Sequence, residues 1–447
     1  MKLFSKVKSF LAMSGIHSVW SLTFAKATGF YILRWVVLTL ILGTVIGSAS
    51  AGFLVSLDWV TKTRENHLVL LAFLPLAGLV IGLVYHYYGK EVQAGNNLLL
   101  DTLYTPKEKI PFKMAPLVYL GTLLTHLFGG SAGREGTAVQ MAGALGDQIT
   151  PWLKLNPDNR KTLLTAAVAA GFASVFGTPL AGAIFGLEVV RVGKVRYPSL
   201  LPVFAAAIWA NYVTHLWQVA HTPYRILAKT DWEPVFFVYC IGAGILFGLT
   251  AAAFSKLMHG TTHVFNRIIA YPPLRPFWGG VLVAVGVWVL GTSKYIGLGL
   301  PTILESFDQP LPFAVFALKL GFTVLTLGAG FKGGEVTPLF FIGATLGSAL
   351  SGIIPLPTAL LAAMGFVAVF AGATNTPLAC TVMGLELFGI ENGTYLALAC
   401  VVAYLSSGHH SIYTSQRVAQ VKLSHLLHHK DKKGGAIHSD QSNTDSK

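Results

Sequence analysis

Charged residues are scarce in this sequence. Asp, Glu, Lys and Arg make up only 11% of its 447 residues, while hydrophobic residues make up 53% and mean hydropathy is +0.61. A typical soluble domain carries roughly 25% charged residues. Residues 336–385 contain none of the four charged types, and about 20 apolar residues are enough for one membrane span. The composition therefore excludes an ordinary soluble domain and indicates an integral membrane protein built of apolar helices.

Acidic residues are fewer than basic ones, 19 against 32, which gives a formal net charge of +13. The excess is better explained by membrane topology than by nucleic-acid binding, because basic residues precede the first long apolar run and follow the last. By the positive-inside rule, both termini are expected in the cytoplasm and the number of full crossings is even. The flanking cations are Lys2, Lys6, Lys8, Lys26, Arg417, Lys422, Lys430, Lys432 and Lys433.

Cysteine is also rare. Cys240, Cys380 and Cys400 lie within apolar runs, so we interpret them as buried small hydrophobes, neither disulfide partners nor metal ligands. The apolar stretch Phe10–Met13 is too short for a secretory signal and reads as part of a retained amphipathic segment. The histidines near the C-terminus could suggest metal, but a basic solvated or lipid-facing segment is favoured. No cofactor and no metal site is expected. These histidines are His409, His410, His425, His428 and His429.

Long apolar runs alternate with short polar loops and suggest five parts. The expected division is a cytoplasmic N-terminal segment (1–30), a first membrane repeat (31–217), a connection (218–234), a second membrane repeat (235–416) and a basic, His-rich cytoplasmic tail without a regulatory domain (417–447).

Arg134 and Glu135 are ionisable residues within an otherwise apolar region. They belong to the glycine-rich stretch Gly129–Thr137. Ionisable groups at membrane depth are costly and mark ion or proton pathways. Glycines let backbone N–H groups approach a ligand, and a helix that begins just after Glu135 would offer free N–H donors and partial positive charge. The stretch predicts an anion site with a built-in carboxylate competitor.

The two halves of the chain repeat each other. Residues 178–188 (TPLAGAIFGLE) match residues 376–386 (TPLACTVMGLE), and their separation is close to that between Glu135 and Glu335. Internal repeats with Gly- or Pro-interrupted apolar segments predict a midplane binding site in a transporter. Five pairs of residues, the two glutamates among them, align in this region. They pair as Gly133 with Gly333, Glu135 with Glu335, Thr137 with Thr337, Gly143 with Gly343 and Ala144 with Ala344.

With these motifs the chain resembles the CLC family of anion channels and anion–proton antiporters over about residues 31–417. Residues 133–137 (GREGT) resemble the family's G-R-E-G-P signature, with Thr137 in place of proline. Residues 328–338 resemble its second signature, G-S-G-x-x-G-G-I-F-A-P. Tyr413 falls where the family has its C-terminal pore tyrosine, although the local match is weaker.

Departures from the family pattern narrow the resemblance. Asn96 replaces the chloride-coordinating serine, and Glu335-Val336-Thr337 stands in place of I-F-A. Val189 aligns with the inner proton-transfer glutamate of chloride antiporters, one place after Glu188. The combination is similar to the fluoride-exporting bacterial branch of the family.

The resemblance implies an all-α membrane protein of two inverted-topology repeats of tilted, broken helices. It also implies a homodimer with one pore per subunit, in a bacterial inner membrane, that exchanges fluoride for protons. The expected partners are fluoride, protons and the lipid bilayer, with no nucleic acid. A transporter of this kind is not an enzyme.

Eight residues are candidates for the site. Glu135 and Glu335 are expected to gate the pathway and couple it to protons. Glu135 would alternate with the anion, and Glu335 would relay protons because a fixed negative charge beside an anion site is counterproductive. The anion-binding candidates are Asn96, Gly133, Arg134, Gly136, Thr337 and Tyr413.

Structural alternatives stand beside these roles. Glu135 could form a salt bridge with Arg134, although adjacent side chains on a helix do not face each other. Glu335 or Thr337 could cap the following helix. Tyr413 could be an ordinary interfacial tyrosine, and the Asn96-Asn97 pair a plain turn. For Glu188 and Glu386, which end the two matching segments, the repetition favours a shared structural role.

Three other functions are alternatives to fluoride–proton exchange. A chloride channel or chloride–proton antiporter of the same fold is the main alternative, and Asn96 and Glu335 argue against it. Residues 129–133 also fit G-x-S-x-G, the elbow of serine hydrolases, but that motif needs a preceding strand and here a membrane helix is expected. A sodium-coupled transporter of unrelated fold would not account for both repeated motifs.

Overall fold

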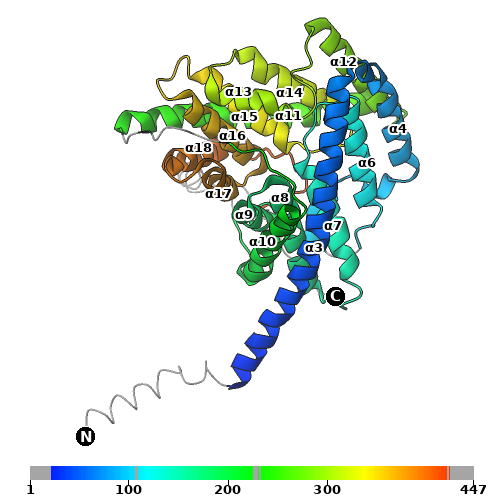
Figure 1. The fold of residues 1–447 in the computed structure, drawn as a ribbon, viewed down its shortest axis with the longest axis vertical. Coiled ribbons are helices and arrows are strands. Elements are labelled where there is room, and N and C mark those ends of the chain that lie inside the picture. Colours follow the sequence, from blue (N-terminus) through cyan, green and yellow to red (C-terminus); the bar gives the residue numbers. More distant parts are fainter. Residues whose placement is uncertain (1–21, 106–108, 225–229, 231–232, 420–421, 423–447) are drawn as a thin grey trace, which may run out of the picture.

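Helices account for nearly all regular structure in this computed structural model, which describes residues 22–105, 109–224, 230, 233–419 and 422 (Figure 1). The first basic residues of the chain, the Phe10–Met13 stretch and most of the His-rich tail lie outside the described residues. The helices of the first half are α3 (Leu22–Asn66), α4 (Leu74–Tyr87), α5 (Asn96–Tyr104), α6 (Met114–Leu127), α7 (Glu135–Ile149), α8 (Pro157–Phe176), α9 (Pro179–Glu188) and α10 (Leu200–Leu216).

A second set follows in the same order of long and short elements. It comprises α11 (Pro234–Ile268), α12 (Leu274–Leu290), α13 (Leu300–Asp308), α14 (Phe313–Gly328), α15 (Val336–Leu350), α16 (Thr358–Thr374), α17 (Pro377–Phe388) and α18 (Gly393–Ser406). Three short 3-10 helices and two two-residue strands complete the described chain: η1 (Leu68–Phe73), η2 (Lys90–Val92), η3 (Tyr197–Ser199), β1 (Arg191–Val192) and β2 (Arg417–Val418). The predicted connection, 218–234, falls between α10 and α11.

The repeat extends to details of the backbone. Helices α7 and α15 each have 15 residues, and α5 and α13 each have nine. Gly95 and Gly299, with φ of 57° and 73°, precede α5 and α13. Helix α8 is followed by Gly177 and α16 by Asn375, both in the left-handed conformation, immediately before the matched Thr-Pro pairs. The predicted breaks in the apolar runs are confirmed.

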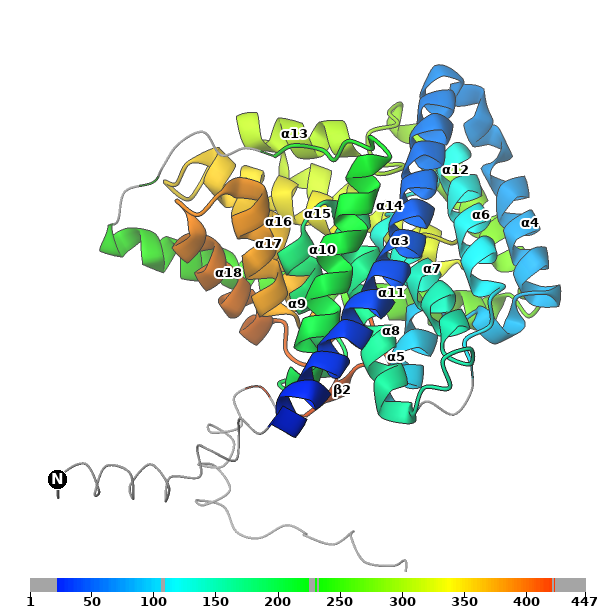
Figure 2. The ribbon, with the colours of Figure 1, turned by 60° about the horizontal axis from the view of Figure 1, so that its bottom comes forward.

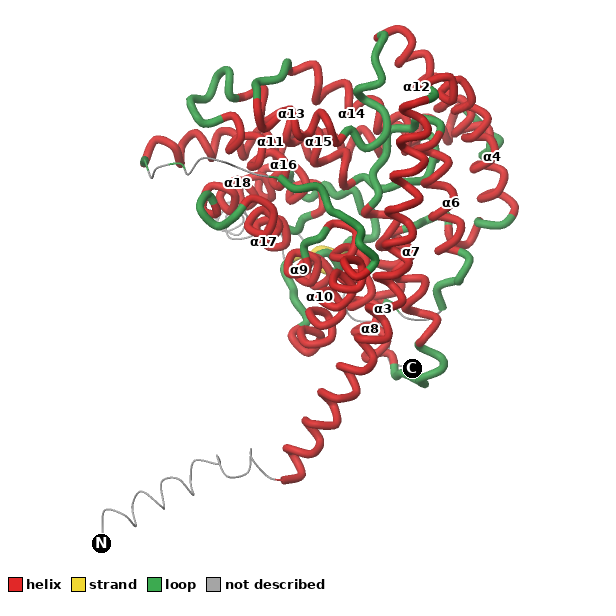
Figure 3. The backbone as a smooth tube through the Cα atoms, in the orientation of Figure 1, coloured by secondary structure: helices red, strands yellow, loops and turns green. Residues whose placement is uncertain are grey.

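Within the described residues, four helical stretches are long and apolar enough to cross a bilayer, judged by length and composition alone: Thr28–Asn66, Leu68–Tyr87, Tyr197–Leu216 and Pro234–Ile268. Most of the others have 10–17 residues. At 1.5 Å per residue, a 15-residue helix spans only about 22 Å, less than the roughly 30 Å of a hydrocarbon core. Loops consequently run through the middle of the molecule as well as over its surface (Figure 3).

Helices α9 and α17 lie side by side and join the two halves (Figure 1). The Glu188 carboxylate, at the end of α9, accepts hydrogen bonds of 3.1 and 2.8 Å from the N–H groups of Leu378 and Ala379 at the start of α17. The Glu386 carboxylate accepts bonds of 2.9 and 2.8 Å from Leu180 and Ala181 at the start of α9. Each helix therefore caps the other, which confirms the predicted structural role of this glutamate pair.

Phenylalanines fill the core where the halves meet. The rings of Phe340 and Phe366 stack with centroids 4.1 Å apart, and Phe172 of the first half lies 6.1 Å from Phe370 of the second. Stacked and edge-on aromatic pairs add to the stabilisation that apolar burial gives. The three cysteines are buried and free, as predicted.

The chain returns to the body after α18. Strand β2 pairs in parallel with β1 at the end of the molecule where α3 begins (Figure 2), and the Lys422 ammonium donates a 3.1 Å bond to Ser407 Oγ. The first residues assigned to the tail from sequence thus pack against the membrane part.

Candidate functional site

Two glycine-lined helix starts meet at the centre of the site. Gly133 and Gly334 form an antiparallel backbone bridge, with N–H···O distances of 2.6 and 2.8 Å. A methyl group on Gly133 would lie 2.9 Å from Gly334 O, and one on Gly334 would lie 2.7 Å from the backbone nitrogen of Gly136. Only glycine permits this approach. The two glycine-rich motifs of the repeats therefore converge on one another.

Glu135 is the first residue of α7 and is fully buried. Its carboxylate points at the start of α15, where it accepts a 3.1 Å bond from the Thr337 N–H and bonds of 2.6 and 2.9 Å from the Thr337 hydroxyl. Free N–H groups and the helix dipole make such a helix start favourable for negative charge. A carboxylate of one repeat therefore occupies an anion-binding position built by the other.

Arg134 also contacts this carboxylate. Its side-chain Nε lies 3.5 Å from Glu135 Oε1 without forming a hydrogen bond. Its backbone N–H donates a 3.3 Å bond to Glu135 Oε2. The expectation that neighbouring side chains would not face each other is wrong here, because Arg134 precedes α7 as its N-cap and is not on the helix surface. The ion pair exists alongside the Thr337 bonds and does not replace them.

Asn96 and Glu335 approach each other around Gly136. A methyl group on Gly136 would lie 3.2 Å from Asn96 Nδ2 and 3.4 Å from Glu335 Oε2. Glu335 precedes α15 but makes no side-chain cap bond, and Thr337 bonds to Glu135, so neither capping alternative holds. Asn96 Oδ1 and Glu335 Oε2 are buried without a hydrogen-bond partner among the described residues. Unpaired buried polar atoms are rare and need an explanation.

A cavity of about 20 Å³ lies next to Asn96. A water molecule needs roughly 10–15 Å³ measured in this way, so the space suits a single small particle. Tyr413 lines it and is only 7% exposed, which rules out an ordinary interfacial tyrosine. The lining residues are Asn96, Leu99, Leu100, Val139, Val168, Phe185, Val189 and Tyr413.

Asn97 fixes the chain segment that carries Tyr413. Its Oδ1 accepts a 3.0 Å bond from the Ser415 N–H, and the Gln416 amide donates a 3.0 Å bond to Val189 O. The asparagine pair is therefore more than a turn, since Asn96 lines the cavity and Asn97 holds the segment that carries Tyr413.

Residues 77–408 match the family model described as voltage gated chloride channel. This chain belongs to the CLC family. It is 50% identical over 406 residues, 90% of this chain and 89% of the relative, to a protein of Pseudomonas syringae pv. tomato named chloride/fluoride channel protein. A solved CLC-type fluoride/proton antiporter superposes with a TM-score of 0.85 and 35% identity over 87% of this chain and 99% of its own.

A slow cyanobacterial Cl−/H+ antiporter shares the fold at a TM-score of 0.74 with 20% identity, over 85% of this chain and 96% of its own. The predicted all-α CLC fold with two inverted repeats of broken helices is thereby confirmed. A sodium-coupled transporter of unrelated fold is the wrong assignment.

Ser131, the serine of the hydrolase-like motif, has structural contacts in this CLC fold. Its hydroxyl lies 2.9 Å from Thr323 Oγ1, and its N–H donates a 3.1 Å bond to Thr326 Oγ1. The element before the motif is helix α6, not the strand that a nucleophile elbow requires.

Two buried cations near this part of the CLC chain, Lys319 and Arg64, were not singled out from sequence. The Lys319 ammonium donates bonds of 2.7 and 3.2 Å to the carbonyls of Gly297 and Tyr295. The Arg64 guanidinium lies 3.4 Å from the carbonyl oxygen of His126, whose two ring nitrogens have no partner among the described residues. In the sequence, Lys319 could have been recognised as a lone lysine inside the apolar segment Phe313–Gly328. The two cations add positive potential beside the Gly129–Gly133 turn.

Proposed function

We propose that this protein is a fluoride/proton antiporter that exports fluoride from the bacterial cytoplasm as a homodimer with one pore per subunit. The observation that carries the proposal is the Glu135 carboxylate bound by both the N–H and the hydroxyl of Thr337 at the start of α15. These donors suit an anion, and Glu135 is an anion that can be neutralised by a proton.

The exchange follows from this competition. While Glu135 is ionised, its carboxylate occupies the Thr337 donors and blocks them. When it takes up a proton, its attraction to those donors weakens, and a halide can replace it. Because the carboxylate and the halide use the same donors in turn, proton uptake and anion entry are linked.

Fluoride is favoured over chloride by size and by the kind of donor. Fluoride is small and strongly hydrated, so its site must replace water with short, strong hydrogen bonds. Hydroxyl and amide groups such as those of Thr337, Tyr413 and Asn96 can donate such bonds, and Asn96 and Tyr413 both line the small cavity of about 20 Å³. The fluoride-related names of two similar proteins agree with this assignment.

Glu335 is proposed as the second proton-carrying group. Its Oε2 is buried near Asn96 and Gly136 and has no hydrogen-bond partner in the described part of the chain. A permanent negative charge there would repel the transported anion, whereas a protonated carboxyl group would not and could donate a hydrogen bond.

The selectivity test uses purified protein in liposomes. With equal gradients, fluoride should leave at least about tenfold faster than chloride, as measured with ion-selective electrodes. Equal rates would instead support the second candidate, a chloride channel or chloride/proton antiporter of the same fold, which the word chloride in the name of the Pseudomonas relative favours.

The coupling test measures protons in the same liposomes. A fluoride gradient should drive protons in the opposite direction, and Glu135→Gln should abolish that movement because an amide cannot take up and release the proton. Glu335→Gln should reduce coupling while leaving the protein folded. Fluoride flux without linked proton movement in the unmodified protein would identify a passive channel.

A further inference from the structure

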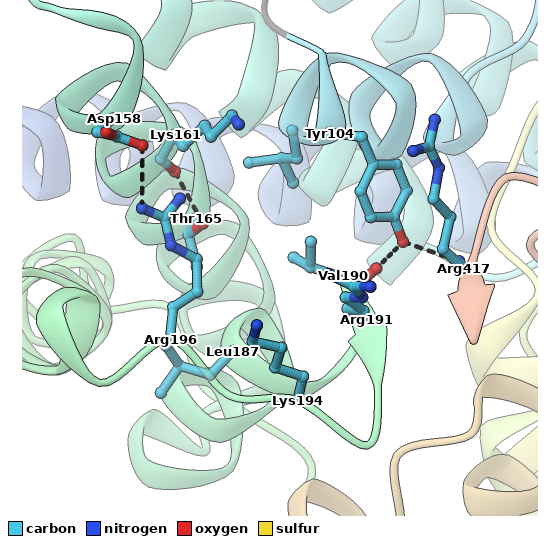
Figure 4. Close-up of a pocket in the computed structure, with 11 residues that line it drawn as sticks. Tyr104, Asp158, Lys161, Thr165, Leu187, Val190, Arg191, Lys194, Arg196 and Arg417 are labelled. Carbon is cyan, nitrogen blue, oxygen red and sulfur yellow. Dashed lines mark hydrogen bonds and ion pairs between the residues drawn. The ribbon is translucent and has the colours of Figure 1, made fainter. Parts of the chain in front are cut away.

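A second cavity, of about 360 Å³, lies at the end of the molecule where β1 and β2 pair (Figure 4). The end of α5, the start of α8, the end of α9 and both strands form its walls. Its volume falls in the range of small-molecule sites, roughly 300–1,000 Å³. The lining residues are Leu103, Tyr104, Asp158, Lys161, Thr165, Leu187, Val190, Arg191, Lys194, Arg196 and Arg417.

The pocket carries a large excess of positive charge. Five of its lining side chains are lysines or arginines, against the single carboxylate of Asp158. That carboxylate is 3.4 Å from the Arg196 guanidinium, which leaves the other four cations without a carboxylate among the lining residues. Such a cluster attracts a multiply charged anion.

Arg191 and Arg417 are paired directly across the two strands, which brings two of these positive charges together. Like charges placed opposite each other in a sheet are destabilising. The two strands pair nevertheless, although each has only two residues. An anion bound between the two guanidinium groups would turn the repulsion into attraction.

The surroundings place the pocket at a lipid–water boundary. Leu103, Leu187 and Val190 give it an apolar wall. Nearby, Trp152 in the α7–α8 loop and Tyr197 in η3 are 89% and 75% exposed. Exposed Trp and Tyr next to basic loops are typical of the membrane interface, and basic pockets between membrane helices suit anionic lipid head groups.

We propose that this pocket binds the phosphate head group of an anionic phospholipid. The basic side chains hold the phosphate, and the leucine and valine wall receives the glycerol and the first part of an acyl chain. A lipid is favoured over a soluble phosphate because the apolar wall and the exposed aromatic residues would be of no use to the latter. This proposal does not depend on which ion the protein transports.

Short contacts connect this basic pocket to the small cavity beside Asn96. The Tyr104 hydroxyl donates to Val190 O and accepts a 2.8 Å bond from the Arg417 N–H, and the Arg417 guanidinium lies 4.4 Å over the Tyr104 ring. Tyr413 lies four residues before Arg417, on the segment that these contacts fix. A bound lipid is therefore expected to hold the cavity wall in place.

The test compares lipid binding to the purified full-length chain and to a double variant, Arg191→Gln with Arg417→Gln. Native mass spectrometry titrates phosphatidylglycerol, and phosphatidylcholine serves as the zwitterionic reference. Each basic group near an anionic lipid contributes about 1 kcal/mol, so removing two should weaken phosphatidylglycerol binding about 30-fold. Phosphatidylcholine binding should change less than about twofold.

The matched control removes two exposed lysines that do not line the pocket, Lys90→Gln with Lys109→Gln, and should leave the affinity within about twofold. Equal weakening by both double variants would show a diffuse charge effect and overturn the proposal. Glycerol phosphate that binds as tightly as phosphatidylglycerol would overturn the lipid source. If the arginine pair is needed for folding, Lys194→Gln, in the exposed loop after β1, should weaken binding about fivefold; unchanged affinity there would also count against the site.

Discussion

Thr337 performs two tasks with one residue. Its backbone N–H belongs to the start of α15, and its hydroxyl supplies a second donor to the same carboxylate of Glu135. A side chain without a hydroxyl at this position would leave the helix start with its N–H groups only. On the proposed function, the threonine hydroxyl adds a second donor for the transported anion at the position that Glu135 occupies here.

Replacing Thr337 tests this role. Hydrogen bonds to charged groups contribute about 1.5–3 kcal/mol, so Thr337→Val should slow fluoride efflux from liposomes about tenfold or more. Thr337→Ser keeps the hydroxyl and should stay within about twofold of the unmodified protein. If the valine variant transports at the same rate as the serine variant, the hydroxyl is not an anion ligand.

Single residues were predictable from sequence where a motif isolates them. Glu135, Gly133 and Glu335 stand out because glycines and apolar residues surround them. The bond from Thr337 to Glu135 was not predictable, since it joins the two repeats and depends on how their helix starts meet. Lys319 was overlooked because its partners are backbone carbonyls, which a sequence does not reveal.

At the scale of elements, the approach of α7 and α15 depends on missing side chains. Gly334→Ala would place a methyl group 2.7 Å from the backbone nitrogen of Gly136, and this overpacking should lower the free energy of unfolding by about 1–3 kcal/mol. Gly242→Ala, in α11 with no atom within 4 Å of the added methyl, should be neutral or stabilising. Thermal unfolding in detergent measures both. Equal melting temperatures for the two variants would mean that the helix starts can separate freely.

The reciprocal caps of α9 and α17 give a second prediction. Glu188→Ala or Glu386→Ala leaves two helix-start N–H groups without an acceptor, which should cost about 1–2 kcal/mol in each case. Glu391→Ala, at an exposed glutamate just after α17, is the control and should change stability by less than about 0.5 kcal/mol. Similar melting temperatures for all three variants would show that these capping hydrogen bonds do not stabilise the fold.

Elements were predictable because glycine and proline punctuate the apolar runs. The Gly177-Thr178-Pro179 break ends α8 and starts α9, and Asn375-Thr376-Pro377 does the same in the second half. The exchange of caps between α9 and α17 could not be predicted. The repeat suggested a shared role for Glu188 and Glu386 but not that each serves the other's helix.

For the whole molecule, the start of α3 and strand β2 lie at the same end (Figure 2). Together with the flanking cations, this leads us to expect both termini in the cytoplasm. Green fluorescent protein fused to the C-terminus should fluoresce, and alkaline phosphatase fused there should be inactive. Phosphatase inserted between α10 and α11, at the opposite end of α10, should be active. An active C-terminal phosphatase would reverse the proposed orientation.

The family motifs made the overall fold predictable, since CLC signatures occur in both halves of the chain. The pairing of β1 with β2 was not predictable. Each strand has two residues, and alternating patterns need at least four or so residues to be recognised. The residues that form the basic pocket are likewise scattered over five segments, and only the fold brings them together.

The mutual capping of α9 and α17 also bears on how the protein is made. When a ribosome has synthesised only the first 233 residues, the start of α9 has no carboxylate from α17, and Glu188 has no helix to cap. In the first half, the N–H groups at the start of α9 and the Glu188 carboxylate therefore lack these hydrogen-bond partners until the second half is inserted. Two separately encoded halves that are produced in the same cell should assemble, whereas the early half alone should be degraded.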